Sequence, residues 1–175
     1  MWQALARDLV HRIERDVVSV LDGLDPWLLD VAVEPGTNSV GWLLWHLTRS
    51  HDRNVSELRG WPQLWVADGW HDAFACSADP DETGYRHSPA RVAAFRSPAP
   101  DVVRAYHRAV VAMIDAYLEA APDDDVTREV ASPTLGDTRT VQRRLVGVLV
   151  EGLEHVGQAA LVRGLLERRA ARPRP

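Results

Sequence analysis

Hydrophobic residues recur at intervals of three and four positions in four long segments of the chain. Spacing of this kind places the apolar side chains on one face of a helix and leaves the other faces polar. Thr37, Asn38 and Ser39 are cap candidates before the second segment, and Gly60 and Pro62 end it. The pattern therefore predicts four long helices, at about residues 2–22, 40–58, 101–121 and 138–168.

The connection between the second and third helices is long, spanning about residues 60–99, and is rich in Pro, Gly and Asp. It contains one short helical pattern, SPARVAAF at residues 88–95, whereas the hint of a strand is DVTREV at residues 125–130. Two short connections and one long crossover are typical of a four-helix bundle. We therefore predict an all-α, antiparallel four-helix bundle, with one domain over residues 1–170 and a frayed tail at 171–175.

The composition is that of an ordinary globular protein, with 46% hydrophobic and 26% charged residues. The net charge is −5 and basic residues cluster only in the tail, which argues against nucleic-acid binding. No run of 18 or more apolar residues occurs and the N-terminal segment is amphipathic, so neither a membrane helix nor a signal peptide is expected. The single cysteine, Cys76, favours a cytoplasmic location, and the absence of lysine excludes a lysine nucleophile.

Polar side chains interrupt two of the apolar helical segments. In VGWLLWHLTRSHDR, His46 lies between tryptophans and leucines, and in LVEGLEHVGQAALVRG, Glu151 borders an apolar stripe with His155 in its middle. Glu151 and His155 are four residues apart and share one helix face, with Gln158 further along it. An unpaired carboxylate in a core costs several kcal/mol, so an arginine or a metal must offset the burial of Glu151.

Two imidazoles and one carboxylate can supply three ligands to a metal ion. Nitrogen and oxygen donors suit zinc, and three protein ligands leave one position open, as in catalytic zinc sites. His46, Glu151 and His155 are therefore candidate metal ligands. The alternative is that both histidines are core residues satisfied by hydrogen bonds and that Glu151 pairs with an arginine. Spacing alone leaves both interpretations open.

The two segments together resemble the DinB-like superfamily, which includes the mycothiol-dependent maleylpyruvate isomerase N-terminal domain and related thiol S-transferases. In that superfamily, a histidine on the second helix and an H-x-x-x-H or E-x-x-x-H motif on the last long helix build a metal site, and G-Q follows closely. His46 matches the first ligand. Glu151 and His155 match the glutamate form of the motif, which resembles the mycothiol-dependent branch, and Gly157 with Gln158 matches the G-Q.

The resemblance implies a metal-dependent thiol S-transferase. A divalent metal, expected to be Zn²⁺, would activate a low-molecular-weight thiol for attack on an electrophilic small molecule, with mycothiol as the implied co-substrate. Gln158 is a candidate for orienting a ligand or the substrate during catalysis. The isomerase carries a further C-terminal domain and this chain ends after the bundle, so isomerase activity itself is not expected. Where the superfamily often has a glutamate shortly after the first ligand, this chain has His51 and Asp52.

Arginines near His46 are candidates for binding a carboxylated substrate or an acidic thiol cofactor. Arg49 and Arg53 follow His46 by three and seven residues, and ordinary surface salt bridges are the alternative. His51 points away from His46 on the helix and is expected at the surface or behind the ligands. The crossover contains three tryptophans, Trp61, Trp65 and Trp70. They are expected either to line a pocket near the metal or to pack in the core.

Two other functions remain open on the sequence alone. One is a metal-binding, stress-related or small-molecule-binding bundle without thiol transfer. The other is a structural dimerisation module whose polar core residues are satisfied hydrogen-bond partners. Metal analysis separates the dimerisation module from the rest, and a conjugation assay with mycothiol separates the two metal-binding functions. The sequence does not decide between a monomer and a homodimer.

Overall fold

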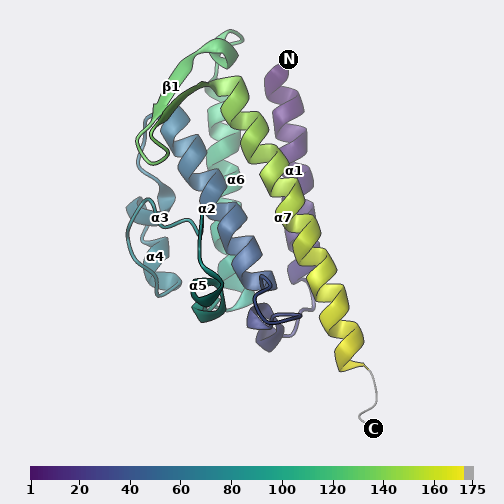
Figure 1. Ribbon diagram of the computed structural model, residues 1–175. Helices are drawn as coiled ribbons and strands as arrows, with labels where there is room; N and C mark the ends of the chain where they lie inside the picture. The colour runs from purple at the N-terminus through teal and green to yellow at the C-terminus, as the bar shows by residue number, and fades with distance from the viewer. Residues whose placement is uncertain (172–175) are drawn as a thin grey trace.

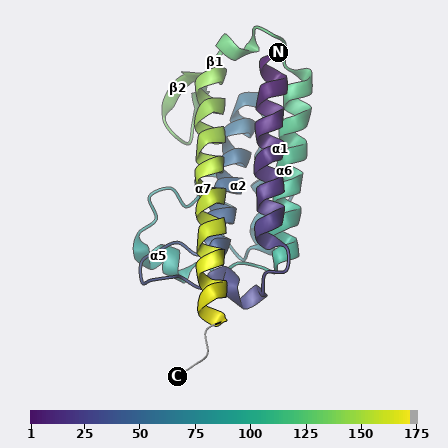
Figure 2. The same cartoon turned by 90° about the vertical axis from the view of Figure 1, so that its right-hand side faces the viewer.

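Four long helices form a bundle, in the order that the hydrophobic pattern predicts (Figure 1). They are α1 (Trp2–Leu21), α2 (Val40–Arg59), α6 (Pro100–Ala120) and α7 (Val141–Ala170). Figures 1 and 2 show that α1 and α7 run in one direction and α2 and α6 in the other, so α2 and α7 are antiparallel neighbours. The predicted all-α fold is confirmed. The computed structural model describes residues 1–171, so most of the predicted tail lies outside the described residues.

Hydrogen-bonding side chains and a glycine fix the ends of the helices that matter for the site. The Ser39 hydroxyl accepts a hydrogen bond from the backbone N–H of Trp42 at 3.2 Å, which caps the start of α2. Thr140 caps α7 in the same way at 3.3 Å. Helix α2 ends at Gly60 with a φ of 68°, a left-handed conformation that glycine adopts without steric cost. Local sequence chemistry therefore sets both ends of α2.

The long crossover between α2 and α6 contains three short helices. Helix α5 (Pro89–Ala94) is the one that the sequence pattern predicts, whereas α3 (Leu64–Ala67) and α4 (Trp70–Ala73) are single turns that no periodicity could reveal. Buried Asp52 of α2 accepts hydrogen bonds from the backbone N–H groups of Leu64 at 2.9 Å and Trp65 at 2.8 Å. The start of the crossover is therefore attached to the middle of the bundle. A 3₁₀ turn, η1 (Pro26–Asp30), links α1 to α2.

A short β-hairpin joins α6 to α7. A 3₁₀ turn, η2 (Asp125–Thr127), precedes β1 (Glu129–Ser132), which pairs antiparallel with β2 (Asp137–Thr140). The strand therefore begins within the segment 125–130 that hinted at one, but the first half of that segment is a turn. The hairpin packs on α2 and lies beside the start of α7 (Figure 1).

Helix α7 forms one side of the bundle, where it packs on α2 and α1. By length and composition alone it is apolar enough to cross a membrane, a test that helices of bundles also pass. Its buried stripe passes through Gly152, Val156 and Ala159, and Val156 is only 3% exposed. The expectation that His155 lies in the middle of the stripe is therefore wrong. The His155 side chain is 18% exposed and lies at the edge that faces α2.

Candidate metal centre

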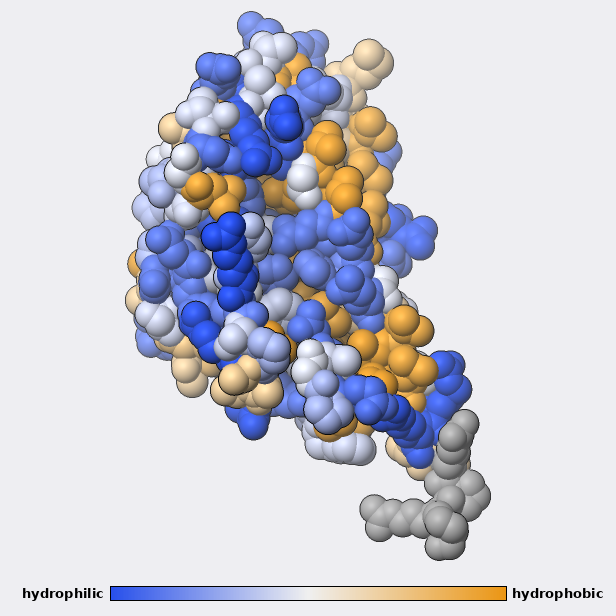
Figure 3. Space-filling model, viewed as in Figure 1, coloured by the Kyte–Doolittle hydropathy of each residue, from blue (hydrophilic) through white to orange (hydrophobic). Residues whose placement is uncertain are grey.

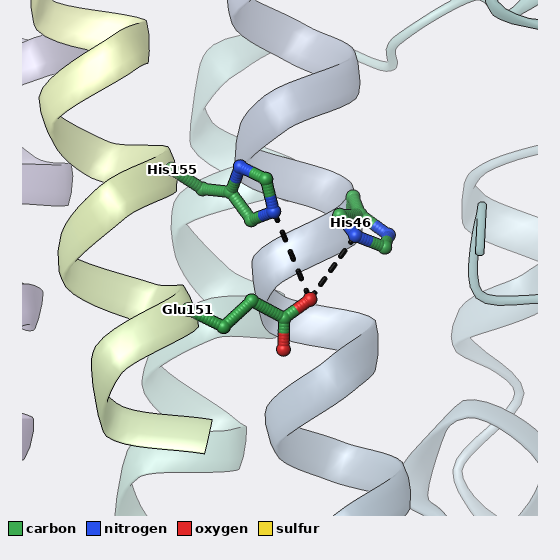
Figure 4. A group of neighbouring side chains, drawn as sticks. All are labelled: His46, Glu151 and His155. Atoms are coloured by element: carbon green, nitrogen blue, oxygen red, sulfur yellow. Dashed lines mark ion pairs between the residues drawn. The ribbon is translucent and has the colours of Figure 1, made fainter. Parts of the chain in front are cut away.

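One histidine from α2 meets a carboxylate and a histidine from α7 (Figure 4). Nε2 of His46 lies 3.1 Å from Oε1 of Glu151, and Nε2 of His155 lies 3.7 Å from the same oxygen. The rings of His46 and His155 are 4.9 Å apart between centroids, edge to face. One donor atom from each residue lies within 4.8 Å of the others. The structure therefore brings together three side chains that about a hundred residues separate in sequence.

The orientation of His46 is fixed from two sides. Its Nδ1 lies 2.5 Å from the backbone carbonyl oxygen of Thr83, in the crossover. A carbonyl only accepts, so Nδ1 must carry the proton and Nε2 presents its lone pair to Glu151. The indole of Trp42 stacks on the imidazole at 4.8 Å between centroids, with 17° between the ring planes. The crossover and α2 together therefore aim Nε2 at the site.

The two residues from α7 are held in the same manner. Nδ1 of His155 lies 3.0 Å from Oε1 of Gln158, three residues along the helix, which leaves Nε2 of His155 free to face Glu151. The outer oxygen of Glu151, Oε2, accepts a hydrogen bond from the hydroxyl of Ser50 on α2. Partners of this kind orient ligands and raise their basicity in metal sites. The candidate ligands therefore have their far sides satisfied and their near sides turned toward one another.

Three hydrogen-bond acceptors consequently converge at one point. Two imidazole lone pairs and a carboxylate oxygen repel one another unless a proton on an imidazole or a cation lies between them. Burial alone raises the pKa of Glu151, but the hydrogen bond from Ser50, and one that His46 donates when Nε2 also carries a proton, outweigh that effect and leave the pKa below its ordinary value. The carboxylate is therefore ionised at neutral pH, and its charge needs a positive partner at this point.

The donor set fits a divalent metal. Two imidazole nitrogens and one carboxylate oxygen are typical ligands of catalytic zinc, and ligand atoms on one zinc lie about 3–4 Å apart. The spacing of the three atoms is within a small side-chain rotation of that range. Zinc ligands in proteins usually have their other polar atoms hydrogen-bonded, as Thr83, Gln158 and Ser50 provide here.

Comparison with known proteins agrees with this arrangement of helices. Residues 9–159, which include all three candidate ligands, match the DinB superfamily. The chain belongs to the DinB superfamily. A solved structure described as the crystal structure of the conserved protein of locus from Enterococcus faecalis superposes with a TM-score of 0.82 at 24% identity, over 93% of this chain and 95% of that one. That likeness shows a shared fold. No curated protein matches the chain.

Of the two arginines singled out in this DinB chain, the structure brings only one near the centre. Arg49 is fully buried, forms an ion pair with Asp52 at 3.3 Å and donates to Gln63 at 2.8 Å, on the side of α2 that faces the crossover. Residues three apart on a helix differ by about 60° around the axis, whereas residues seven apart differ by about 20°. Arg53 therefore keeps the face of His46 and Arg49 does not.

The structure also shows where His51 and the tryptophans lie. His51 is 1% exposed, so it occupies the second of the two positions expected for it, behind the ligands and not at the surface. Its Nε2 lies 3.2 Å from the carbonyl oxygen of Val148, behind the ligands. Burial lowers the pKa of His51, with the charge of Glu151 acting in the opposite direction. Trp42, and not a crossover tryptophan, is the indole that contacts the candidate ligands: Trp65 is buried in the core and Trp61 is 66% exposed.

Sequence reasoning missed three contributors to the centre. Ser50 follows His46 by one helical turn, and this spacing is a signal that could have identified it. Thr83 contributes a backbone carbonyl, which side-chain patterns cannot reveal. Gly84 permits the crossover to approach α2, because a Cβ there would lie 2.8 Å from Trp45 and 3.0 Å from Nδ1 of His46.

We expect Gly84→Ala to damage the centre and the fold together. The φ of Gly84 is +86°, which costs alanine about 1–2 kcal/mol, and the added methyl group would push against the His46 ring. Loss of the Thr83 contact should weaken metal binding by roughly 10–100-fold, as for other partners of metal ligands. Zinc titration and thermal unfolding of the variant measure both effects.

Gly36→Ala is the matched control for this variant. Its φ is +83°, and a Cβ there meets nothing within 4 Å in the described part of the chain. Gly36→Ala should therefore lose the stability that alanine costs at a positive φ, without losing metal affinity. Equal metal affinities of the two variants would mean that the approach of the crossover to His46 does not matter for the centre.

Proposed function

We propose that this protein is a metal-dependent thiol S-transferase. The observation that carries the proposal is the convergence of three acceptor atoms from His46, Glu151 and His155, each already satisfied on its far side. Three N/O ligands with an open position are characteristic of catalytic zinc sites, whereas structural zinc sites close the position with a fourth protein ligand. The resemblance of the E-x-x-x-H motif to the thiol-transferase branch of the superfamily supplies the reaction class.

Three residues would bind the cation, and others would orient these ligands. His46 and His155 would hold a divalent cation through Nε2, and Glu151 through Oε1. When bound, the cation supplies positive charge that lowers the pKa of an incoming thiol. Thr83, Gln158 and Ser50 would keep the ligands in register through the hydrogen bonds described above. Gln158 thus acts on His155 as a positioning residue.

Mycothiol is the thiol that we propose as co-substrate, with an electrophilic small molecule as its partner. In the overall reaction the thiol loses a proton and its sulfur forms a bond to the electrophilic carbon, from which a leaving group departs. Zinc is the metal proposed, because imidazole and carboxylate ligands in a three-ligand site suit it. The support is the glutamate form of the motif and the donor set, and neither depends on Cys76.

A paired measurement tests the proposal. Purified protein is analysed for metal, and the metal-loaded and chelator-treated forms are then assayed for conjugation of mycothiol to 1-chloro-2,4-dinitrobenzene. We expect about one zinc per chain and conjugation only in the loaded form. A protein that binds the metal but conjugates none of mycothiol, glutathione and coenzyme A would instead be the metal-binding, stress-related or small-molecule-binding bundle.

We expect Cys76→Ser to leave conjugation and metal binding nearly unchanged. Burial raises the pKa of the Cys76 thiol and the nearby Glu82 raises it further, so the thiol stays protonated near neutral pH and is a poor nucleophile. Its Sγ donates to the carbonyl oxygen of Phe74 at 3.3 Å. Steady-state rates of the variant and the unmodified protein provide the comparison, and a loss of turnover in Cys76→Ser would mean that the protein uses its own thiol.

A further inference from the structure

A cationic pocket opens beside the candidate metal centre. It has a volume of about 270 Å³ and lies between the second half of α2, the β-hairpin and the first turns of α7. Figure 3 shows hydrophilic residues gathered on this face, whereas hydrophobic residues follow the edge formed by α1 and α7. One acidic residue, Glu151, lines the pocket. Four arginines also line it: Arg53, Arg139, Arg143 and Arg144.

The four guanidinium groups are unequally neutralised. Arg139 and Arg144 share one carboxylate, that of Asp137, at 2.7 Å and 2.8 Å. Within the described residues, Arg53 and Arg143 form no ion pair. The lining therefore holds two arginines that already have an anionic partner and two that lack one, so the pocket has an excess of positive charge.

Arg53 is the most informative of these groups because it is both charged and buried. It is 8% exposed, its Nη1 reaches only Thr83 Oγ1 at 3.4 Å, and its Nε is buried without a hydrogen-bond partner in the described part of the chain. Burial lowers the pKa of Arg53, while Glu57 and Glu151 act against that effect at a distance. A buried cation without a paired anion is costly, so its retention here points to a ligand that completes it.

We propose that this pocket binds a carboxylate group of a molecule that reacts at the centre formed by His46, Glu151 and His155. The planar guanidinium fork of arginine binds carboxylates through two parallel hydrogen bonds, and Arg53 and Arg143 both have donors to offer. A volume of about 270 Å³ lies just below the usual range for whole ligands, which suits one end of a small molecule.

Charge favours a carboxylate over a phosphate. The four positive charges of the arginines are offset by two carboxylates at the pocket, those of Asp137 and Glu151, and by Glu57, which acts on Arg53 at a distance. An excess of about one positive charge remains, which matches a single carboxylate, such as one end of succinate, better than a phosphate dianion. The shared lining residue Glu151 places the bound carboxylate next to the centre, so the reacting atom would lie a few bonds away. Only this last step rests on the proposed function.

Calorimetric titration with succinate tests the proposal on protein treated with chelator, so that no metal can bind the anion. Neutral succinamide is the matched probe. We expect succinate to bind and succinamide not to, and Arg143→Ala to weaken succinate binding roughly 10–100-fold, the effect of losing a charge-assisted hydrogen bond. Arg143 is exposed, so the variant should fold. Arg53→Met, which keeps the apolar stem, should weaken binding at least as much.

Arg108→Ala is the control for net charge, because Arg108 lies on the far side of the bundle, where it approaches Glu14 of α1. It should bind succinate as the unmodified protein does. Equal affinities of Arg143→Ala and Arg108→Ala, equal binding of succinamide, or tighter binding of inorganic phosphate than of succinate would each overturn the proposal.

The same titration separates this proposal from the metal-dependent function. His155→Ala should lose metal and keep succinate binding, whereas Arg143→Ala should lose succinate binding and keep metal. Loss of succinate binding in metal-free His155→Ala would contradict a separate carboxylate pocket. In the conjugation assay, competition of succinate with the electrophile would assign the carboxylate to the electrophile, and competition with the thiol would assign it to the thiol.

Discussion

His155→Ala should lose metal binding and thiol conjugation while the bundle stays folded. Removing a direct ligand leaves only His46 and Glu151, and the loss of affinity should exceed the roughly 10–100-fold that follows from removing a partner of a ligand. The side chain lies at the edge of α7 and is 18% exposed, so little packing is lost. Zinc competition titration, circular dichroism and the conjugation assay measure the three properties on one sample.

Two controls sharpen this prediction. His71 is also 18% exposed but lies on α4, so His71→Ala removes an equally buried imidazole and should keep the metal. Glu151→Gln keeps the shape of a ligand and removes its charge, and it should weaken metal binding, whereas Glu154→Gln on the solvent side of the same helix should not. Retained zinc and turnover in His155→Ala would mean that these three residues are hydrogen-bonded neighbours and not a metal centre.

Asp52→Asn should cause the largest loss of stability of any single polar substitution in α2. Its carboxylate is fully buried and accepts hydrogen bonds from Tyr106 at 2.8 Å and from the backbone of Leu64 and Trp65, besides pairing with Arg49 at 3.3 Å. The amide leaves Arg49 buried without its anion, at a cost of about 3–5 kcal/mol. For a domain of this size the midpoint of thermal unfolding should fall by about 6–20 °C.

Asp16→Asn is the matched control for Asp52→Asn. Asp16 pairs with Arg12 at 2.8 Å four residues away on α1, where both side chains are partly exposed to water. Such a pair contributes about 0.3–0.5 kcal/mol, so the control should barely move the midpoint. If the free energies of unfolding of the two variants differ by less than about 1 kcal/mol, the buried network around Asp52 does not stabilise the crossover as described.

Periodicity was sufficient to predict the four long helices, because an amphipathic helix of twenty or more residues repeats its signal many times. It failed for α3 and α4, which are single turns. Helix α3 is held by hydrogen bonds to Asp52, twelve and thirteen positions away in the sequence. Periodicity also misplaced His155 by one position around α7, since the buried stripe follows Val156. Packing between helices, and not the pattern within one helix, decides such details.

The candidate ligands were recognisable because each is a polar group in an apolar helical setting. The groups that orient them were not, because Thr83 acts through its backbone and Gly84 through the absence of a side chain. The sequence could identify only some of the arginines that line the cationic pocket. Arg53 shares a helix face with His46, but Arg139 reaches the pocket because the hairpin packs on α2, and Arg143 because the start of α7 packs beside α2.

Anomalous diffraction at the zinc absorption edge, from a crystal grown with zinc, tests the metal centre most directly. We expect one anomalous peak at about 2.0–2.2 Å from Nε2 of His46, Nε2 of His155 and Oε1 of Glu151. The same peak should be absent from data collected below the edge. A density map with no peak at this point, and with the three side chains hydrogen-bonded only to one another and to protein neighbours, would contradict the presence of a metal centre in this bundle.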